Sequence, residues 1–321
     1  MNHGNVATDI ATGLLELQQR IAAANIPSSK LDESINIATW NIREFGKGSG
    51  RSKKSIHYIA EILYQFDLIA ITELNRNLRD LQKVMDVLGP YWDVVFSDYT
   101  ADWGGNWERV GYLFDKRAVV FTGLASEVDS FNRKKVDGEY QSAFSWWRNP
   151  YIASFSAGTF DFVLITAHIR WGDKESDRIA PLKNLAEWVH KRRSDTYGTD
   201  KDIILMGDFN IPEMKGPLFE AITSKGLKAP KKLMVPDLGS NLEKNKRYDQ
   251  ILHYPSIDDC FTNHAGVLDF YQDDYSTLYQ TENLSMAQFT RQLSDHLPLW
   301  IQINTDVSTI KLDQLIQRRL K

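Results

Sequence analysis

Short apolar runs alternate along the chain with longer segments in which apolar side chains recur every three or four residues. Short runs rich in β-branched and aromatic residues are typical of strands, whereas the longer spacing is typical of helices that bury one face. The pattern predicts strands at 35–40, 68–72, 92–96, 109–114, 118–121, 152–155, 160–167, 202–206, 249–253, 266–268 and 297–303. It predicts helices at 52–65, 77–87, 176–193, 218–224 and 308–320. Many short strands with helices between them indicate an α/β protein built in layers.

A further amphipathic helix is predicted ahead of these elements, at residues 7–24. Its apolar stripe includes Ile10, Leu14 and Ile21, and Pro27 follows its end. Such stripes usually pack on a core, and an arm that pairs two copies is the alternative. No repeat and no Pro/Gly/Ser-rich linker divides the middle of the chain. We therefore predict an N-terminal helix and linker at 1–34, one domain at 35–303 and a C-terminal helix at 304–321.

Charge narrows the range of partners. Among 321 residues, 38 Lys and Arg against 42 Asp and Glu give a net charge of −4, which excludes binding to nucleic acid by bulk positive charge. A polyanionic partner would therefore have to bind at a local cluster of basic residues. Residues 43–54 carry five basic residues and one acidic residue, and residues 225–247 carry seven and two, whereas residues 269–283 carry four acidic residues and no basic one. These runs are expected to be solvated loops unless they surround a site.

Cysteine content and the start of the chain bear on its compartment. One cysteine, Cys260, permits neither an internal disulfide framework nor a thiolate-rich zinc site. Residues 1–10 lack the basic and apolar regions of a signal peptide, and no run approaches 18 apolar residues. We expect a cytoplasmic protein with no membrane partner.

Polar side chains gather where the predicted strands begin or end. They are Asn41, Glu73, His168, Asp208, Asn210, Asp295 and His296. Singly, such residues are usually caps, but asparagine and carboxylate oxygens together suit a hard cation such as Mg²⁺. A carboxylate-paired histidine can move a proton near neutral pH. The set therefore predicts metal-assisted hydrolysis of a phosphate ester.

Four segments resemble the endonuclease/exonuclease/phosphatase superfamily, to which deoxyribonuclease I-like proteins belong. They are Trp40-Asn41-Ile42-Arg43, Thr72-Glu73-Leu74, Gly207-Asp208-Phe209-Asn210 and Ser294-Asp295-His296-Leu297-Pro298, in that order. The resemblance covers about residues 35–303. It implies an α/β four-layer sandwich of two mostly antiparallel β-sheets flanked by helices, with the site at the strand ends, and Mg²⁺ or, as a substitute, Mn²⁺ as the cofactor.

The resemblance also implies roles for individual residues. Asn41, Glu73 and Asp295 match the metal-binding group. Asp208 and Asn210 match the pair that orients the attacking water and stabilises the transition state.

Two histidines receive roles in the same way. His296 matches the site histidine, with Asp249 as the carboxylate that orients it. His168 matches the second histidine, which contacts the scissile phosphate, with Glu108 as its support.

Cationic and aromatic residues complete the predicted site. Arg148 resembles an arginine that contacts phosphate in the family. Arg43 and Arg170 lie next to site residues in the sequence and are predicted to contact phosphate as well. Four tryptophans, Trp103, Trp107, Trp146 and Trp147, are expected either to pack the long loops or to stack on bases.

The first functional hypothesis is a Mg²⁺-dependent phosphodiesterase that hydrolyses nucleic acid, as a DNA endonuclease, by attack of an activated water. Either His296 or Asp208 is the general base. One alternative keeps the chemistry but acts on inositol phosphates or phospholipid headgroups, and another is a catalytically inactive binding module. Oligomeric state stays open.

Overall fold

The computed structural model describes residues 1–100, 107–130, 133–198, 200–236 and 238–319. Its strands are β1 (Ser34–Phe45), β2 (Leu68–Asn75), β3 (Trp92–Phe96), β4 (Glu108–Asp115), β5 (Val120–Glu127), β6 (Arg133–Val136), β7 (Glu139–Ser142), β8 (Tyr151–Ala157), β9 (Phe160–His168), β10 (Ile203–Asp208), β11 (Asp249–His253), β12 (Phe261–Val267) and β13 (Leu299–Asn304). Its α-helices are α1 (Thr8–Ala23), α2 (Lys53–Leu63), α3 (Arg79–Leu88), α4 (Ile179–Ser194), α5 (Pro217–Thr223), α6 (Met286–Gln292) and α7 (Ser308–Arg319).

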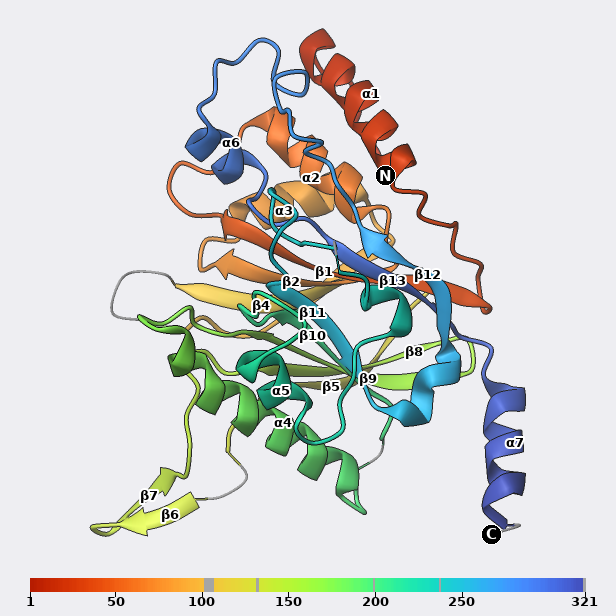
Figure 1. The fold of residues 1–321 in the computed structure, drawn as a ribbon. Helices are drawn as coiled ribbons and strands as arrows, with labels where there is room; N and C mark the ends of the chain where they lie inside the picture. The colour runs from red at the N-terminus through yellow and green to blue at the C-terminus, as the bar shows by residue number, and fades with distance from the viewer. Residues whose placement is uncertain (101–106, 131–132, 199, 237, 320–321) are drawn as a thin grey trace.

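Two main sheets lie face to face, with helices on both outer faces (Figure 1). The first sheet has the order β12-β13-β1-β2-β4-β3 and the second β11-β10-β9-β8-β5. In each sheet one neighbouring pair is parallel, β1–β2 in the first and β9–β10 in the second, and the other pairs are antiparallel. The predicted sandwich of mostly antiparallel sheets flanked by helices is confirmed.

Strand alternation produces three apolar layers. On β1, Ile35 and Ile37 face the other sheet, whereas Trp40 and Ile42 face helices α1 to α3. Successive side chains of a strand point to opposite faces of the sheet and so enter different layers. A strand covered by helices on one face and by the other sheet on the opposite face is therefore apolar on both faces. A third layer packs α4 and α5 against the outer face of the second sheet.

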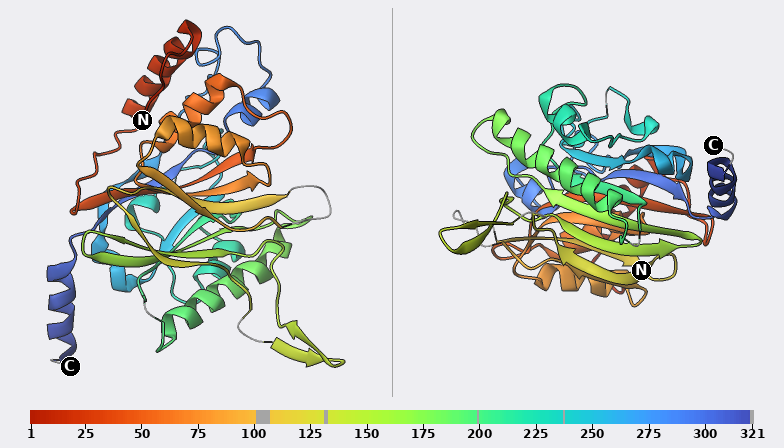
Figure 2. Two further views of the ribbon diagram at one scale, coloured as in Figure 1. Left: turned by 180° about the vertical axis from the view of Figure 1, so that it is seen from behind. Right: turned by 90° about the horizontal axis from the view of Figure 1, so that it is seen from below.

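The two terminal helices, α1 and α7, lie on opposite sides of the two-sheet domain (Figures 1 and 2). The apolar stripe of α1 packs into the layer beneath it, and the buried Arg20 donates to the backbone carbonyls of Phe270, Tyr271 and Asp274. Helix α7 leaves Leu312 exposed on its surface. Among the described helices, none is long and apolar enough to cross a membrane.

Some predicted element boundaries are wrong. The strand predicted at 118–121 is β5, shifted to Val120–Glu127, and the one predicted at 266–268 is β12, which begins at Phe261. Both lie at sheet edges and are only partly buried, so their apolar pattern is weak. The hairpin β6–β7 and the short helix α6 were not predicted, because the hairpin is exposed and α6 has only seven residues. The predicted last residue of the C-terminal helix, Leu320, lies outside the described residues.

Candidate active site

The site residues continue the faces of strands that point between the two sheets. Each of the strands β1, β4, β9, β10 and β11 turns apolar side chains into this inter-sheet layer. At one end of the layer the same faces become polar, at Asn41, Glu108, His168, Asp208 and Asp249. Strand direction explains why they meet: parallel β9 and β10 both end here, while β4 and β11, antiparallel to their neighbours, begin here. Alternation and topology thus converge on one buried polar cluster.

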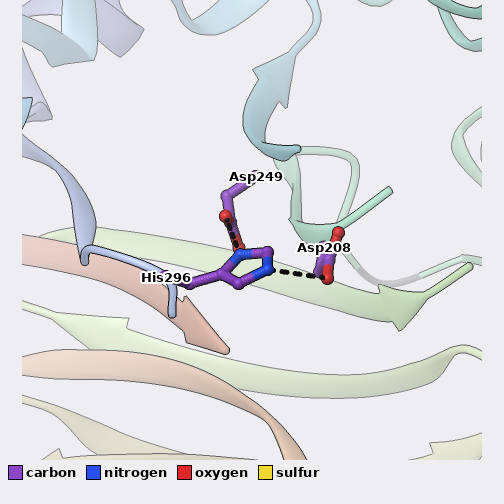
Figure 3. A group of neighbouring side chains, drawn as sticks. All are labelled: Asp208, Asp249 and His296. Carbon is purple, nitrogen blue, oxygen red and sulfur yellow. Dashed lines mark hydrogen bonds and ion pairs between the residues drawn. The ribbon is translucent and has the colours of Figure 1, made fainter. Parts of the chain in front are cut away.

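Two histidines and three carboxylates form a continuous chain of contacts. His296 Nδ1 hydrogen bonds to Asp249 Oδ2 at 2.7 Å, and its Nε2 lies 3.8 Å from Asp208 Oδ2 (Figure 3). His168 repeats the arrangement, with Nδ1 at 2.9 Å from Glu108 Oε2 and Nε2 at 3.6 Å from Asp208 Oδ2. Asp208 therefore lies between two imidazoles, each held from behind by its own carboxylate.

The electrostatics follow from this alternation. Burial opposes a charged His296 ring, but Asp249 and Asp208 outweigh it and raise the pKa of His296 to about 10. Burial and Arg148 oppose a charged His168, yet Glu108 and Asp208 raise its pKa as well. Burial disfavours a charged Asp208, and the two imidazoles reverse that effect and lower its pKa. The cluster is arranged to keep protons on its histidines and negative charge on Asp208.

A second group of oxygens lies beside this chain. The Asn41 amide donates to Glu73 Oε1 and to Asp208 Oδ2, both at 3.0 Å, while its buried Oδ1 has no partner among the described residues. Glu73 has φ 60°, at the point where β2 shifts register against β4, and its Oε2 accepts from the Glu44 amide at 2.8 Å. An orphaned amide oxygen beside carboxylates is the donor set of a hard cation, so these residues fit Mg²⁺.

The cluster opens into a cavity of about 430 Å³. Its lining residues are Asn41, Glu73, Glu108, Trp147, Arg148, His168, Arg170, Trp171, Gly172, Asp208, Asn210, Asp295 and His296. Asp249 lies behind His296, fully buried. Arg43 is not among the lining residues: its guanidinium donates to Thr290 at 2.6 Å and lies 3.4 Å from Asp295. The structure thus brings together all the predicted site residues except Arg43, which lies beside the cavity.

One glycine permits the two central strands to approach. Gly207 has φ +146°, and a Cβ at this position would lie 2.2 Å from the Ala167 carbonyl oxygen of the neighbouring strand. No side chain fits there. Gly207 pairs with Ala167 and directly precedes Asp208, which pairs with His168. The close contact of Gly207 with β9 therefore fixes the position of Asp208 relative to His168.

A sequence model of the endonuclease/exonuclease/phosphatase family matches residues 38–296. The chain belongs to this family. The match begins on β1, ahead of Asn41, and ends at His296, so it includes each of the site residues described above.

Relatives within the endonuclease/exonuclease/phosphatase family include nucleases. A deoxyribonuclease of Thioalkalivibrio sp. (strain K90mix) is 30% identical over 199 residues, which cover 58% of this chain and 49% of that protein. Deoxyribonuclease-1 of Bos taurus is 25% identical over 187 residues, which cover 56% of this chain and 62% of that protein. The chain therefore matches less than two thirds of either relative. A family protein from Bacteroides thetaiotaomicron has the same fold, with a TM-score of 0.56 at 17% identity, covering 85% of this chain and 96% of that one.

Several features of this family member were not predicted. Trp171 lines the cavity, and Tyr248 lies between it and His296, with ring centroids 5.5 and 5.8 Å away. The signal for Trp171 was its position directly after Arg170. Of the predicted aromatic cluster, Trp147 lines the cavity, Trp146 is buried against α4, Trp107 lies beneath the guanidinium of Arg76, and Trp103 is outside the described residues.

Three cations of the basic segments are buried inside the fold. Arg51 donates to the backbone carbonyls of Arg43 and Glu44, and Lys54 pairs with Asp9 and Glu282. In the second segment, Arg247 is buried and donates to backbone carbonyls too. These three cations therefore hold loops in place and do not face the cavity.

Proposed function

We propose that the chain is a divalent-metal-dependent phosphodiesterase that cleaves nucleic acid, with DNA as the substrate. The observation that carries the proposal is the cavity itself, in which oxygen donors, two carboxylate-held histidines and two arginines line one space of about 430 Å³. Phosphodiester hydrolysis needs these functions together: charge stabilisation, proton transfer and phosphate binding.

The metal-binding group is Asn41, Glu73 and Asp295. Bound there, Mg²⁺ supplies charge stabilisation for the phosphate and the leaving oxygen. Asp208, Asp249 and His296 also offer three ligand atoms within 4.8 Å of one another, the one such group of at least three His, Cys, Asp or Glu residues in the described part of the chain. Because His296 Nδ1 and Asp249 Oδ2 already bond to each other, we assign this second group to proton transfer.

The two histidines have different partners and hence different tasks. Asp249 holds a proton on His296 Nδ1, and the raised pKa of about 10 keeps a second proton on Nε2, which faces the cavity and can exchange with water. Asp208, within 4 Å of both Nε2 atoms, orients the attacking water or takes its proton. His168 contacts the phosphate, and the neighbouring Asn210 contributes its amide to the transition state.

The protein as a whole has a net charge of −4, so the positive charge that binds a phosphate has to come from cations at the cavity. Arg148 and Arg170 line the cavity, and Arg148 also pairs with Glu108 at 2.9 Å. An arginine fork matches two phosphate oxygens. The two deoxyribonucleases among the relatives support DNA as the polymer that carries this phosphate.

A substrate panel tests the proposal. Plasmid DNA, single-stranded DNA, RNA, an inositol polyphosphate and sphingomyelin are each incubated with Mg²⁺ and with EDTA. We expect nucleic acid cleavage that EDTA abolishes, and a loss of about 10²–10⁴-fold in rate for His296→Ala, the range of a positioned acid or base. Hydrolysis of the lipid or the inositol phosphate without DNA cleavage contradicts the assignment, as does an unchanged rate in the variant.

A further inference from the structure

Two indole rings stand exposed at the cavity. Trp171 is 52% exposed and Trp147 is 40% exposed, although the cavity is otherwise lined by charged and polar residues. Large aromatic side chains are usually buried, because leaving their apolar area in water forfeits much of the burial free energy. Exposed aromatic rings at a concave polar site are typical of a surface that a ligand covers.

Trp171 is held in place by the fold. The Arg178 guanidinium lies 4.4 Å from its ring centroid, and Tyr248 packs edge-on against it at 84°. Arg178 is itself buried and donates to the Asn210 carbonyl at 2.8 Å, which ties the indole to a residue of the active site. The indole is therefore positioned before a ligand arrives, and about half of its surface stays open.

The turn after Trp171 is equally well defined. Gly172 has φ +75°, and a Cβ there would lie 3.0 Å from the side chain of Asp177. The same Asp177 carboxylate accepts from the amides of Asp173 and Lys174 at 3.1 and 3.0 Å. This turn sets the direction in which the chain leaves Trp171, so the position of the indole does not depend on a long flexible loop.

The second indole follows the same pattern. The guanidinium of Arg170 lies 4.1 Å from the ring centroid of Trp147, and Arg170 precedes Trp171 in the chain. Each exposed indole therefore packs against an arginine: Trp147 against Arg170, which lines the cavity, and Trp171 against Arg178, which is buried behind it. Rings that stack on bases, interleaved with cations that meet phosphates, are the pattern by which proteins bind single-stranded nucleic acid.

We propose that Trp171, with Trp147 beside it, stacks on a nucleobase adjacent to the scissile phosphate, and that the substrate is therefore nucleic acid with unpaired bases. This inference rests on the proposed nuclease function. Inside a duplex each base face is covered by its neighbours, so an indole reaches a base face only in a single strand, a loop or a displaced nucleotide. A phosphate bound without its base leaves both indoles exposed.

Binding of three oligonucleotides tests the stacking. Labelled 12-mers, one single-stranded, one single-stranded but abasic throughout and one duplex, are titrated in EDTA and followed by fluorescence anisotropy. We expect the base-bearing single strand to bind roughly 10- to 100-fold more tightly than the abasic strand. Trp171→Ala is expected to lose most of that preference, whereas Trp171→Phe, which keeps a flat ring, retains most of it. Tyr197→Ala removes an aromatic side chain that is 94% exposed and outside the cavity, and it serves as the control.

The outcomes separate the two proposals. If the wild type binds the duplex or the abasic strand as tightly as the base-bearing strand, or if Trp171→Ala keeps the preference, the stacking inference is overturned. Cleavage in Mg²⁺ provides the second measurement: Trp171→Ala should raise KM for the base-bearing strand, whereas Tyr197→Ala should leave it unchanged. A wild type that cleaves no oligonucleotide overturns the nuclease function itself, whereas equal cleavage of all strands by wild type and variant overturns only the stacking.

Discussion

Asp249→Asn isolates the part that the buried carboxylate behind His296 plays. Asp249 is fully buried, and its Oδ2 lies 2.7 Å from His296 Nδ1. An asparagine amide turned toward the ring donates where the carboxylate accepted, which moves the ring proton from Nδ1 to Nε2. The ring, which despite its burial Asp249 and Asp208 keep charged in the wild type by raising its pKa to about 10, then becomes neutral, and its Nε2 proton is exchanged less readily. We expect the rate to fall about 10²–10⁴-fold, equal to about 3–5 kcal/mol of transition-state stabilisation.

Stability should change much less than activity. Asparagine fills the same space, and His296 can give up its charge once the carboxylate is gone, so no unpaired ion remains buried. We expect a change in the free energy of unfolding below about 2 kcal/mol, measured by thermal denaturation of the variant. Cleavage of a single-stranded DNA oligonucleotide in Mg²⁺ gives the rate. Asp258→Asn is the matched control, because Asp258 lies 3.4 Å from His253 at the opposite end of β11 and should leave the rate unaltered.

A double variant decides whether Asp249 acts through the ring. In a His296→Ala background, Asp249→Asn should cost little more, because the residue it orients is already absent. Losses that multiply, or a single variant as active as the wild type, would show that Asp249 does not act through His296. A rate loss accompanied by unfolding at the assay temperature would show that Asp249 is needed for the fold instead.

Three further predictions concern the strand contact, a buried acid and the metal. Gly207→Ala should destabilise the fold by at least about 2 kcal/mol in thermal denaturation, because its Cβ overlaps the Ala167 carbonyl, whereas Gly123→Ala, with φ +108° but no atom within 4 Å, should cost only the backbone strain. Burial raises the pKa of Asp67 to about 6, so the folded state holds this proton more tightly than the unfolded state and loses stability as pH rises from about 4 to 6. Asp67→Asn should therefore gain about 1–3 kcal/mol at pH 7 and nothing near pH 4, and equal gains at both pH values would contradict the pKa. Glu73→Gln should weaken activation by Mg²⁺, seen as a higher Mg²⁺ concentration for half-maximal cleavage, and an unchanged requirement would remove Glu73 from the metal site.

Much of the architecture could be predicted from the sequence because the central strands are apolar on both faces. Strands β1, β9 and β10 are long, buried runs, and their polar ends mark the site. The motifs around Asp208 and His296 then indicate the family. The hydrophobic pattern and the motifs lead to the same site, because the buried strands end in the polar residues that form it.

The parts that escaped prediction depend on contacts distant in sequence. Arg43 follows Asn41 closely, yet the tip of its side chain binds Thr290, and no local pattern shows that direction. Trp171 looks like an ordinary loop residue until Arg178 and Tyr248 are placed around it. Edge strands such as β5 carry too little buried apolar area to give a clear period.

Three of the close pairs at the active site join one sheet to the other. Glu108 on β4 reaches His168 on β9, Asn41 on β1 reaches Asp208 on β10, and His296, just before β13, reaches Asp249 on β11. Catalytic geometry is consequently a direct measure of the spacing between the two sheets. A substitution deep in the layer between them, such as Phe162→Leu, is expected to alter turnover without touching substrate, and hydrostatic pressure should change activity before the chain unfolds. The apolar packing that makes the fold stable is also the device that sets the distance across which protons move.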